Sequence, residues 1–169
     1  YAIAFSENPS KLGFPSLYTG LWDVLWNACQ ETDTTVSMHI GSSSSMPTTS
    51  PDAPLATSMS LYAHNAQASL ADWIFSKSLS RFPKLKLAYA ESQAGWMPFQ
   101  LERMDSVWKD GVGGVDLATA PSQQVKGHVW NCIFDDLHGL RARHEYSVDS
   151  ILFETDYPHS DGTFPHSRK

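Results

Sequence analysis

The feature that most constrains this chain is a regular alternation of short strand-type runs with longer helical stretches. Five runs rich in small, β-branched and aromatic residues are each closed by polar or turn-forming residues, and they predict strands at 2–5, 35–40, 85–90, 129–134 and 150–153. Repeated β-α units of this kind predict a parallel sheet covered by helices, which is an α/β fold.

The stretches between the predicted strands carry apolar stripes at helical spacing. The stretch 21–29 places its apolar residues at i, i+1, i+4, i+5 and i+8, which is one face of an amphipathic helix. Three more helices are predicted over 62–74, 101–108 and 137–146. The segment 42–54 is rich in Ser, Thr and Pro, and it predicts a long loop of the kind that is functional or mobile.

Composition places the chain among ordinary globular domains. Of its 169 residues, 41% are hydrophobic and 18% are charged, which is enough for a single domain, 1–169, with a real core. The formal charge of -6 disfavours a nucleic-acid partner, because an acidic chain repels phosphate. No apolar run reaches the roughly 18 residues that span a bilayer, so no membrane partner is expected.

The cysteines and the chain ends lead to further expectations. Cys29 and Cys132 have apolar neighbours and predict buried free thiols in a reducing, cytoplasmic environment. The chain starts inside a strand at Tyr1 and ends at Lys169 without a helix stop, which indicates missing sequence on both sides. Missing strands would leave both sheet edges unpaired, so the isolated chain is expected to be marginally stable. Assembly of the protein into a homo-oligomer remains possible.

Polar side chains stand at or just beyond the C-terminal end of every predicted strand. In parallel α/β folds, this edge of the sheet is where sites are built. A polar residue that simply begins a loop explains any one case, but it explains His39 poorly, because apolar Ile40 follows it inside the strand pattern. The five candidates are Glu7, His39, Glu91, Asp135 and Asp156.

Five strands are too few to close an eight-stranded barrel, which takes about 250 residues. The chain therefore corresponds either to strands four to eight of a (β/α)8 barrel or to a five-stranded open sheet. Three motifs favour the partial barrel: SMHIGSS at 37–43, AESQAGWMP at 90–98 and LFETDYPH at 152–159. In this order they resemble the amidohydrolase-related family (amidohydrolase 2), on its aminocarboxymuconate-semialdehyde decarboxylase-like branch.

The resemblance implies a mononuclear divalent-metal site, usually zinc. It implies that His39 is the fifth-strand ligand and that Asp156 is the eighth-strand carboxylate, which also exchanges a proton with water or product. Imidazole nitrogen and carboxylate oxygen suit Zn2+. Glu91 stands where the family often has a histidine, and it is a ligand, an acid/base group or a structural carboxylate. The family's His-x-His pair does not occur in this sequence.

Two further residues are assigned to substrate binding. His159 is expected to contact substrate or support Asp156, the alternative being an exposed loop histidine. Trp96 directly follows a strand end and is expected to form a pocket wall, the alternative being simple packing. The sequence contains no Gly-x-Ser-x-Gly nucleophile elbow and no phosphate-binding loop.

These residues predict a metal-dependent hydrolase or carboxy-lyase that acts on a small carboxylated or cyclic organic substrate, with Asp156 and Glu91 as catalytic residues. Two other classes stay open: an inactive or metal-free fragment or homologue, and an open-sheet α/β binding protein. Hydrolysis and decarboxylation are not separated, because both use the same metal and neighbouring carboxylates.

Overall fold

The computed structural model describes residues 1–167. Within them a single five-stranded sheet has the order β1-β2-β3-β4-β5, and each neighbouring pair is parallel. The predicted strands, their direction and their order are therefore confirmed. The strands are β1 (Ala2–Phe5), β2 (Thr35–His39), β3 (Leu87–Ala90), β4 (Val129–Ile133) and β5 (Ile151–Phe153).

Helices connect each strand to the next. The predicted helical stretches correspond to α1, α3, α5 and α7, whereas α2, α4 and α6 have seven residues or fewer and are too short to show a periodic stripe. Short 3-10 turns lie at Pro9–Leu12, Leu17–Thr19, Val112–Gly114 and Val148–Ser150. The α-helices are α1 (Asp23–Glu31), α2 (Leu55–Leu61), α3 (Ala63–Phe75), α4 (Ser78–Arg81), α5 (Met97–Lys109), α6 (Pro121–Gln124) and α7 (Leu137–Tyr146).

Four strand boundaries differ from the prediction. β4 ends at Ile133 instead of Phe134, and in the other three strands a local turn takes the residue. β2 ends at His39 instead of Ile40, since the Ser42 N–H donates to the His39 carbonyl at 3.0 Å. β3 begins two residues late because the Leu85 N–H turns back to Phe82. Ser150 belongs to the 3-10 turn before β5.

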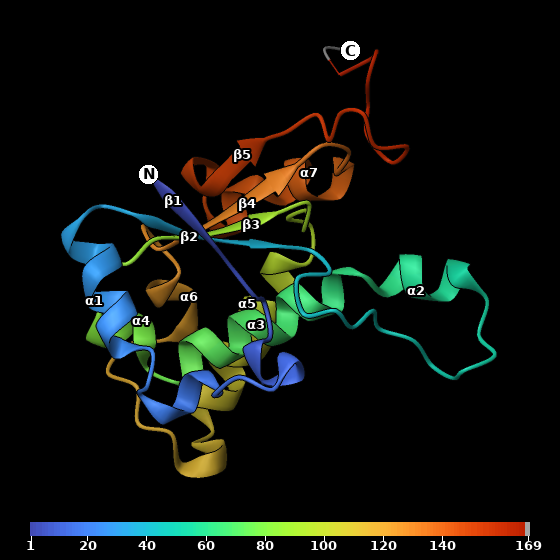
Figure 1. The fold of residues 1–169 in the computed structure, drawn as a ribbon. Helices are drawn as coiled ribbons and strands as arrows, with labels where there is room; N and C mark the ends of the chain where they lie inside the picture. The colour runs from blue at the N-terminus through green and yellow to red at the C-terminus, as the bar shows by residue number, and fades with distance from the viewer. Residues whose placement is uncertain (168–169) are drawn as a thin grey trace.

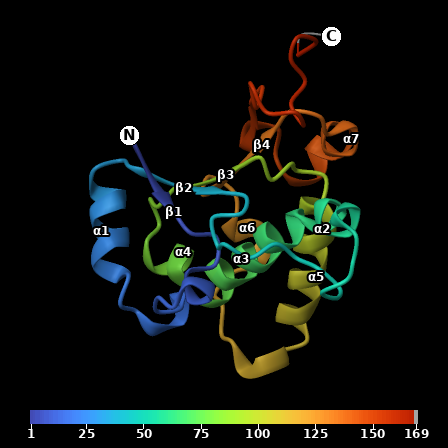
Figure 2. The ribbon, with the colours of Figure 1, turned by 45° about the vertical axis from the view of Figure 1, so that its right-hand side comes forward.

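The sheet has one covered face and one uncovered face. Helices α1, α3, α5 and α6 lie on the same side of the sheet in both ribbon views (Figures 1 and 2). A doubly wound open sheet carries helices on both faces and reverses its strand order at a switch point. One covered face and sequential parallel order are instead the geometry of part of a (β/α)8 barrel, so the predicted partial barrel is confirmed over the open sheet.

The covered face packs on an aromatic core. Trp26 and Trp73 are fully buried with ring centroids 4.7 Å apart, and Phe5 stands edge-on to Trp26 at 5.1 Å. The Trp73 indole N–H also points at the Met38 sulfur, 3.2 Å away. Burying each such side chain contributes about 1.5–3 kcal/mol. This packing fixes β1 and β2 against α1 and α3, and with them the position of the residue that ends β2.

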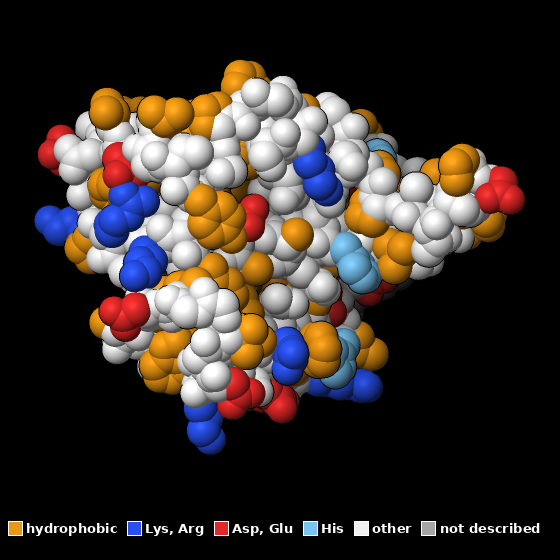
Figure 3. Space-filling view, turned by 90° about the horizontal axis from the view of Figure 1, so that it is seen from below, with side chains coloured by type: hydrophobic (Ala, Val, Ile, Leu, Met, Phe, Trp, Pro, Cys, Tyr) orange, Lys and Arg blue, Asp and Glu red, His pale blue; other side chains and the backbone are white. Residues whose placement is uncertain are grey.

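The segment that includes α2 is more exposed than the other helices. No residue of α2 is buried, and with the preceding loop it projects from the body (Figure 1). Seen from below, hydrophobic and charged side chains are interspersed over the helix-covered side, and the projection stands out at the right (Figure 3). No helix in residues 1–167 has the length and apolarity needed to cross a membrane.

Both cysteines are free, as predicted, but only one is in the core. Cys29 is 3% exposed, whereas Cys132 is half-buried on β4, on the uncovered side of the sheet. The prediction of two core thiols was therefore wrong for Cys132, because a strand alternates its side chains between faces and Ile133 took the core position. Burial, then the charges of Glu154 and Glu91, raises the pKa of Cys132 to about 11.

Candidate metal and active site

The C-terminal ends of β2, β3 and β5 surround one cavity of about 210 Å3. Its polar wall combines two imidazoles with three carboxylates, and its apolar wall comes from the loop after β2, the end of α2 with the residue after it, and the residue after β4. The lining consists of His39, Glu91, Asp156, His159 and Asp161 on the polar side and Ile40, Gly41, Met46, Met59, Tyr62 and Phe134 on the other.

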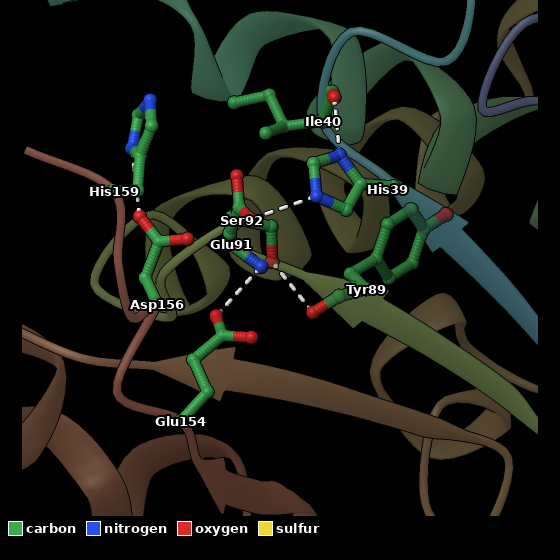
Figure 4. A network of polar contacts seen from close by, with 8 residues as sticks. All are labelled: His39, Ile40, Tyr89, Glu91, Ser92, Glu154, Asp156 and His159. Atoms are coloured by element: carbon green, nitrogen blue, oxygen red, sulfur yellow. Dashed lines mark hydrogen bonds and ion pairs between the residues drawn. The ribbon is translucent and has the colours of Figure 1, made fainter. Parts of the chain in front are cut away.

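His39 is the last residue of β2, and both of its ring nitrogens are engaged. Nδ1 lies 2.6 Å from the Ile40 carbonyl oxygen, and Nε2 lies 2.7 Å from Oε1 of Glu91 (Figure 4). A carbonyl only accepts, so Nδ1 carries a proton and Nε2 is the nitrogen left for the cavity. Burial lowers the pKa of His39, but the Ile40 carbonyl and the Glu91 carboxylate outweigh it, and the net pKa is raised.

Glu91 follows β3 directly and has a left-handed backbone with φ of 58°. Its side chain is 20% exposed and faces His39. Burial raises the pKa of Glu91, attraction to His39 lowers it, and Asp156 raises it, so that the net pKa lies above the usual value. Because Nδ1 of His39 already donates to Ile40, Nε2 and Glu91 share one further proton, which suits a group that gives and takes protons.

Asp156 lies in the segment that follows β5, and its backbone is also left-handed, with φ of 51°. Its side chain is only 10% exposed, and Oδ2 accepts from Nδ1 of His159 at 2.8 Å. His159 itself is 59% exposed and lines the same cavity. The His159 N–H of the backbone also donates to the Asp156 carbonyl at 2.8 Å. The turn therefore orients the Asp156 carboxylate before any ligand is present.

The donor chemistry fits part of a divalent-metal shell. His39 offers Nε2 with its other nitrogen held by a carbonyl, the usual arrangement of a metal-binding histidine. Asp156 offers a carboxylate oxygen held by a histidine, and Glu91 lies beside both. Within the described residues, however, no three His, Cys, Asp or Glu side chains form a metal-binding group. The residues present therefore supply some, but not all, of the ligands.

The remaining predicted candidates lie outside this cavity. The Trp96 indole N–H donates to the carbonyls of Ser92 and Gln93, and the ring stands edge-on to Tyr89 at 6.4 Å. Trp96 therefore packs beneath the loop after β3, and it is not among the lining residues.

The other two strand-end carboxylates have separate surroundings. Asp135 is exposed and does not line the cavity. Glu7 is 2% exposed and lies against the loop after β2, where its own N–H donates to the Ser42 hydroxyl at 2.9 Å. Sequence position alone placed all five polar groups at one edge, but only His39, Glu91 and Asp156 share a cavity.

Several residues in and around the cavity were not predicted from the sequence to belong to a site. Met46 and Met59 belong to the loop and helix that precede α3, and Tyr62 formed part of an apolar helical stripe that predicted burial in the core. Glu154 stands two residues before Asp156, and its Oε1 accepts the Glu91 N–H at 2.7 Å. Burial raises the pKa of Glu154, the Glu91 N–H lowers it, and the Glu91 and Asp156 charges raise it further, for a net rise.

The fold and the strand-end donors define a partial barrel of the amidohydrolase type. The amidohydrolase family model (amidohydrolase 2) matches residues 3–169, and the chain belongs to this family. The predicted family is therefore confirmed. A search of curated proteins gave no match.

Solved structures of the same fold are similar over most of this chain. An amidohydrolase from Mycobacterium avium subsp. paratuberculosis K-10 superposes with a TM-score of 0.74 and 22% identity, over 95% of this chain and 43% of the other. The 5-carboxyvanillate decarboxylase of Sphingomonas paucimobilis gives 0.70 and 16%, over 93% and 48%.

A third structure holds a metal. The dihydroxybenzoic acid decarboxylase of Polaromonas sp. JS666, with bound manganese and 2-nitroresorcinol, gives a TM-score of 0.60 and 14% identity, over 85% of this chain and 45% of the other. The chain thus spans less than half the length of each of these three proteins. At these identities the similarity shows the fold.

Proposed function

We propose that this chain is part of a metal-dependent carboxy-lyase or hydrolase that acts on a small carboxylated or cyclic organic substrate. The observation that carries the proposal is the convergence of His39, Glu91 and Asp156 on one cavity from the ends of three different strands. Similarity to decarboxylases with TM-scores of 0.70 and 0.60 supports the carboxy-lyase reading.

His39 and Asp156 are the proposed metal donors. A divalent cation held between them would offset the carboxylate charges of the cavity and polarise a substrate oxygen. The resemblance of the sequence implies zinc, and manganese is bound in the decarboxylase from Polaromonas. Both ions are therefore candidates. The remaining ligands would come from outside the described residues.

Glu91 is the proposed proton donor. In a decarboxylation the carbon–carboxyl bond breaks, CO2 leaves, and a proton must replace it on the carbon. The Glu91 carboxyl lies at the cavity wall, and its pKa is raised, first through burial. A general acid works best when its pKa approaches the working pH. Asp156, held by His159, keeps its carboxylate fixed toward the same space.

A hydrolase remains the second candidate, and a specific observation favours it. Glu91 occupies the position at which the family resemblance leads one to expect a histidine. A carboxylate there suits removal of a proton from water during attack on an ester or amide carbonyl. Because the same residues serve both reactions, the substrate decides between them.

The apolar wall suits a small ring. Ile40, Met59, Tyr62 and Phe134 face the polar residues across a cavity of about 210 Å3. A flat carboxylated ring would place its ring against this wall and its carboxylate toward His39 and Asp156. A small-molecule partner and a cytoplasmic location remain predictions, as does the absence of a nucleic-acid partner.

The test uses the full-length protein, stripped of metal and reloaded with Mn2+ or Zn2+. CO2 release is measured with 5-carboxyvanillate and 2,6-dihydroxybenzoate as probes, and ring opening is measured with dihydrocoumarin, an aryl lactone. We expect metal-dependent turnover of at least one probe class. A full-length protein that binds neither ion and turns over none of the probes would favour the metal-free homologue instead.

A further inference from the structure

Glu91 occupies a backbone position that needs support from another part of the chain. The β3–β4 pairing runs only to Tyr89 opposite Asn131, so the N–H of Glu91 has no strand partner. The residue also has φ of 58°, in the left-handed region that side chains with a Cβ avoid. A short loop in this conformation keeps one geometry only if its surroundings hold it.

The support comes from two residues that reach the loop from different strands. Asn131 on β4 is fully buried, and its amide donates to the Ser92 hydroxyl at 3.1 Å and to the Gln93 carbonyl at 3.0 Å. Glu154, after β5, accepts the Glu91 N–H at 2.7 Å, which is a short N–H···O hydrogen bond. Asn131 thus holds the residues after Glu91, and Glu154 holds Glu91 itself. Figure 4 shows the contact between Glu154 and Glu91.

Glu154 is itself fixed by the sheet. Its N–H donates to the Ile133 carbonyl at 3.0 Å, which extends the β4–β5 pairing by one residue. Its side chain reaches the residue that follows β3. Asp156 lies two residues after Glu154 in the same segment. One residue therefore links the two strand ends that carry Glu91 and Asp156.

We propose that Glu154 is a positioning residue that acts through Glu91. By accepting the Glu91 N–H, it sets the backbone geometry from which the Glu91 carboxylate faces Nε2 of His39 at 2.7 Å. The contact stands on its own geometry, and only its consequence for metal binding rests on the proposed function. A third carboxylate beside Glu91 and Asp156 is electrostatically unfavourable, so the acceptor oxygen, and not the charge, is what the position requires.

Two substitutions separate the acceptor from the charge. Glu154→Gln keeps a carbonyl oxygen that can accept the same N–H, whereas Glu154→Ala removes it. The matched control is Glu102→Ala, an exposed glutamate on α5. In the full-length protein we expect hydrogen exchange of the Glu91 amide to accelerate by about tenfold or more in Glu154→Ala and to stay near the wild-type rate in the Gln and control variants.

Mn2+ titration of the metal-free protein by calorimetry measures the consequence. A cation held at Nε2 of His39 would be attracted by the Glu91 carboxylate, so misplacing Glu91 should weaken Mn2+ binding. Loss of such a supporting partner costs roughly 10–100-fold in metal affinity. We expect about a tenfold loss in Glu154→Ala, less than about threefold in Glu154→Gln, and no further loss when Glu154→Ala is added to Glu91→Ala.

Several outcomes would overturn the proposal. These are wild-type exchange of the Glu91 amide in Glu154→Ala, a Gln variant as impaired as the Ala variant, or an equal loss of Mn2+ affinity in the Glu91→Ala background. If the wild-type protein binds no Mn2+, the proposed function fails, and the amide exchange alone still decides whether Glu154 holds Glu91.

Discussion

The two faces of the sheet are built from different residues. The face toward the helices carries Val36, Met38, Leu87 and Tyr89, all at most 1% exposed, and it holds the strands in place. The uncovered face carries residues that are partly or fully exposed, such as Ala4, Ser37, Ala88, Trp130 and Leu152, and leads to the cavity at the strand ends. The residues that stabilise the fold and the residues of the candidate site therefore lie on different faces of the sheet. Variants on the covered face should change stability, and variants at the cavity should change activity.

The largest effect is expected at the strand ends. His39→Ala or Asp156→Ala in the full-length protein should lower turnover by about 10²–10⁴-fold, because each removes a proposed metal donor of the cavity. Metal content per protein, measured by elemental analysis, should fall as well. The 58% exposure of the His39 side chain predicts little change in unfolding free energy.

His138→Ala provides the control for that experiment, since His138 is an exposed histidine on α7. It should change neither turnover nor metal content. Full activity in the His39→Ala, Asp156→Ala double variant would remove the proposed site altogether.

The covered face should show the opposite pattern. Trp73→Ala removes a fully buried ring that packs on Trp26, and large-to-small changes of this kind cost about 3–5 kcal/mol. Urea unfolding measures the loss. Val24→Ala on α1, where the side chain is 84% exposed, should cost less than about 0.5 kcal/mol. Similar losses in the two variants would show that the core does not lie where the covered face places it.

An intermediate effect is expected where the two regions meet. Asp136 accepts the N–H groups of Ala94 and Gly95, both at 2.6 Å, and that of Gly139 at 2.7 Å. It thereby ties the loop after β3 to the start of α7. Removing this acceptor of three N–H groups, which also caps α7, predicts a loss of about 1.5–3 kcal/mol for Asp136→Ala. The exposed neighbour provides the control, and Asp135→Ala should stay within about 0.5 kcal/mol in the same denaturant experiment.

The smallest effect concerns pH. Burial raises the pKa of Glu7, against the lowering effects of the Gly41 and Ser42 backbone groups. The folded protein therefore binds more protons than the unfolded chain between the ordinary value of 4.5 and the raised one, and stability is lost as pH rises through that window. Glu7→Gln lacks this titration. Unfolding free energies from pH 4 to 7 should fall more steeply for the wild type than for Glu7→Gln, and parallel curves would contradict the assignment.

The sequence predicted the candidate site only in part. His39 and Asp156 followed from motifs, because a strand end fixes which edge of the sheet a residue reaches. Trp96 was placed at a strand end, but it lies at the start of α5, and its indole turns back to the carbonyls of Ser92 and Gln93. Side-chain direction after a strand depends on the backbone of the turn. Glu91 and Gln93 have left-handed φ values, which a sequence usually indicates by Gly, and neither residue is Gly.

The alternation of strand and helix patterns by itself determined the α/β class, the parallel sheet and the edge at which polar groups gather, since hydrophobic periodicity is a local property of the chain. Tertiary structure decided which of those groups meet. Glu154 contacts Glu91 across 63 positions of sequence, and Tyr62 faces a cavity although its helical spacing predicted core. Such contacts depend on how strands and loops are placed against one another, and that placement is set by the packing of the whole sheet.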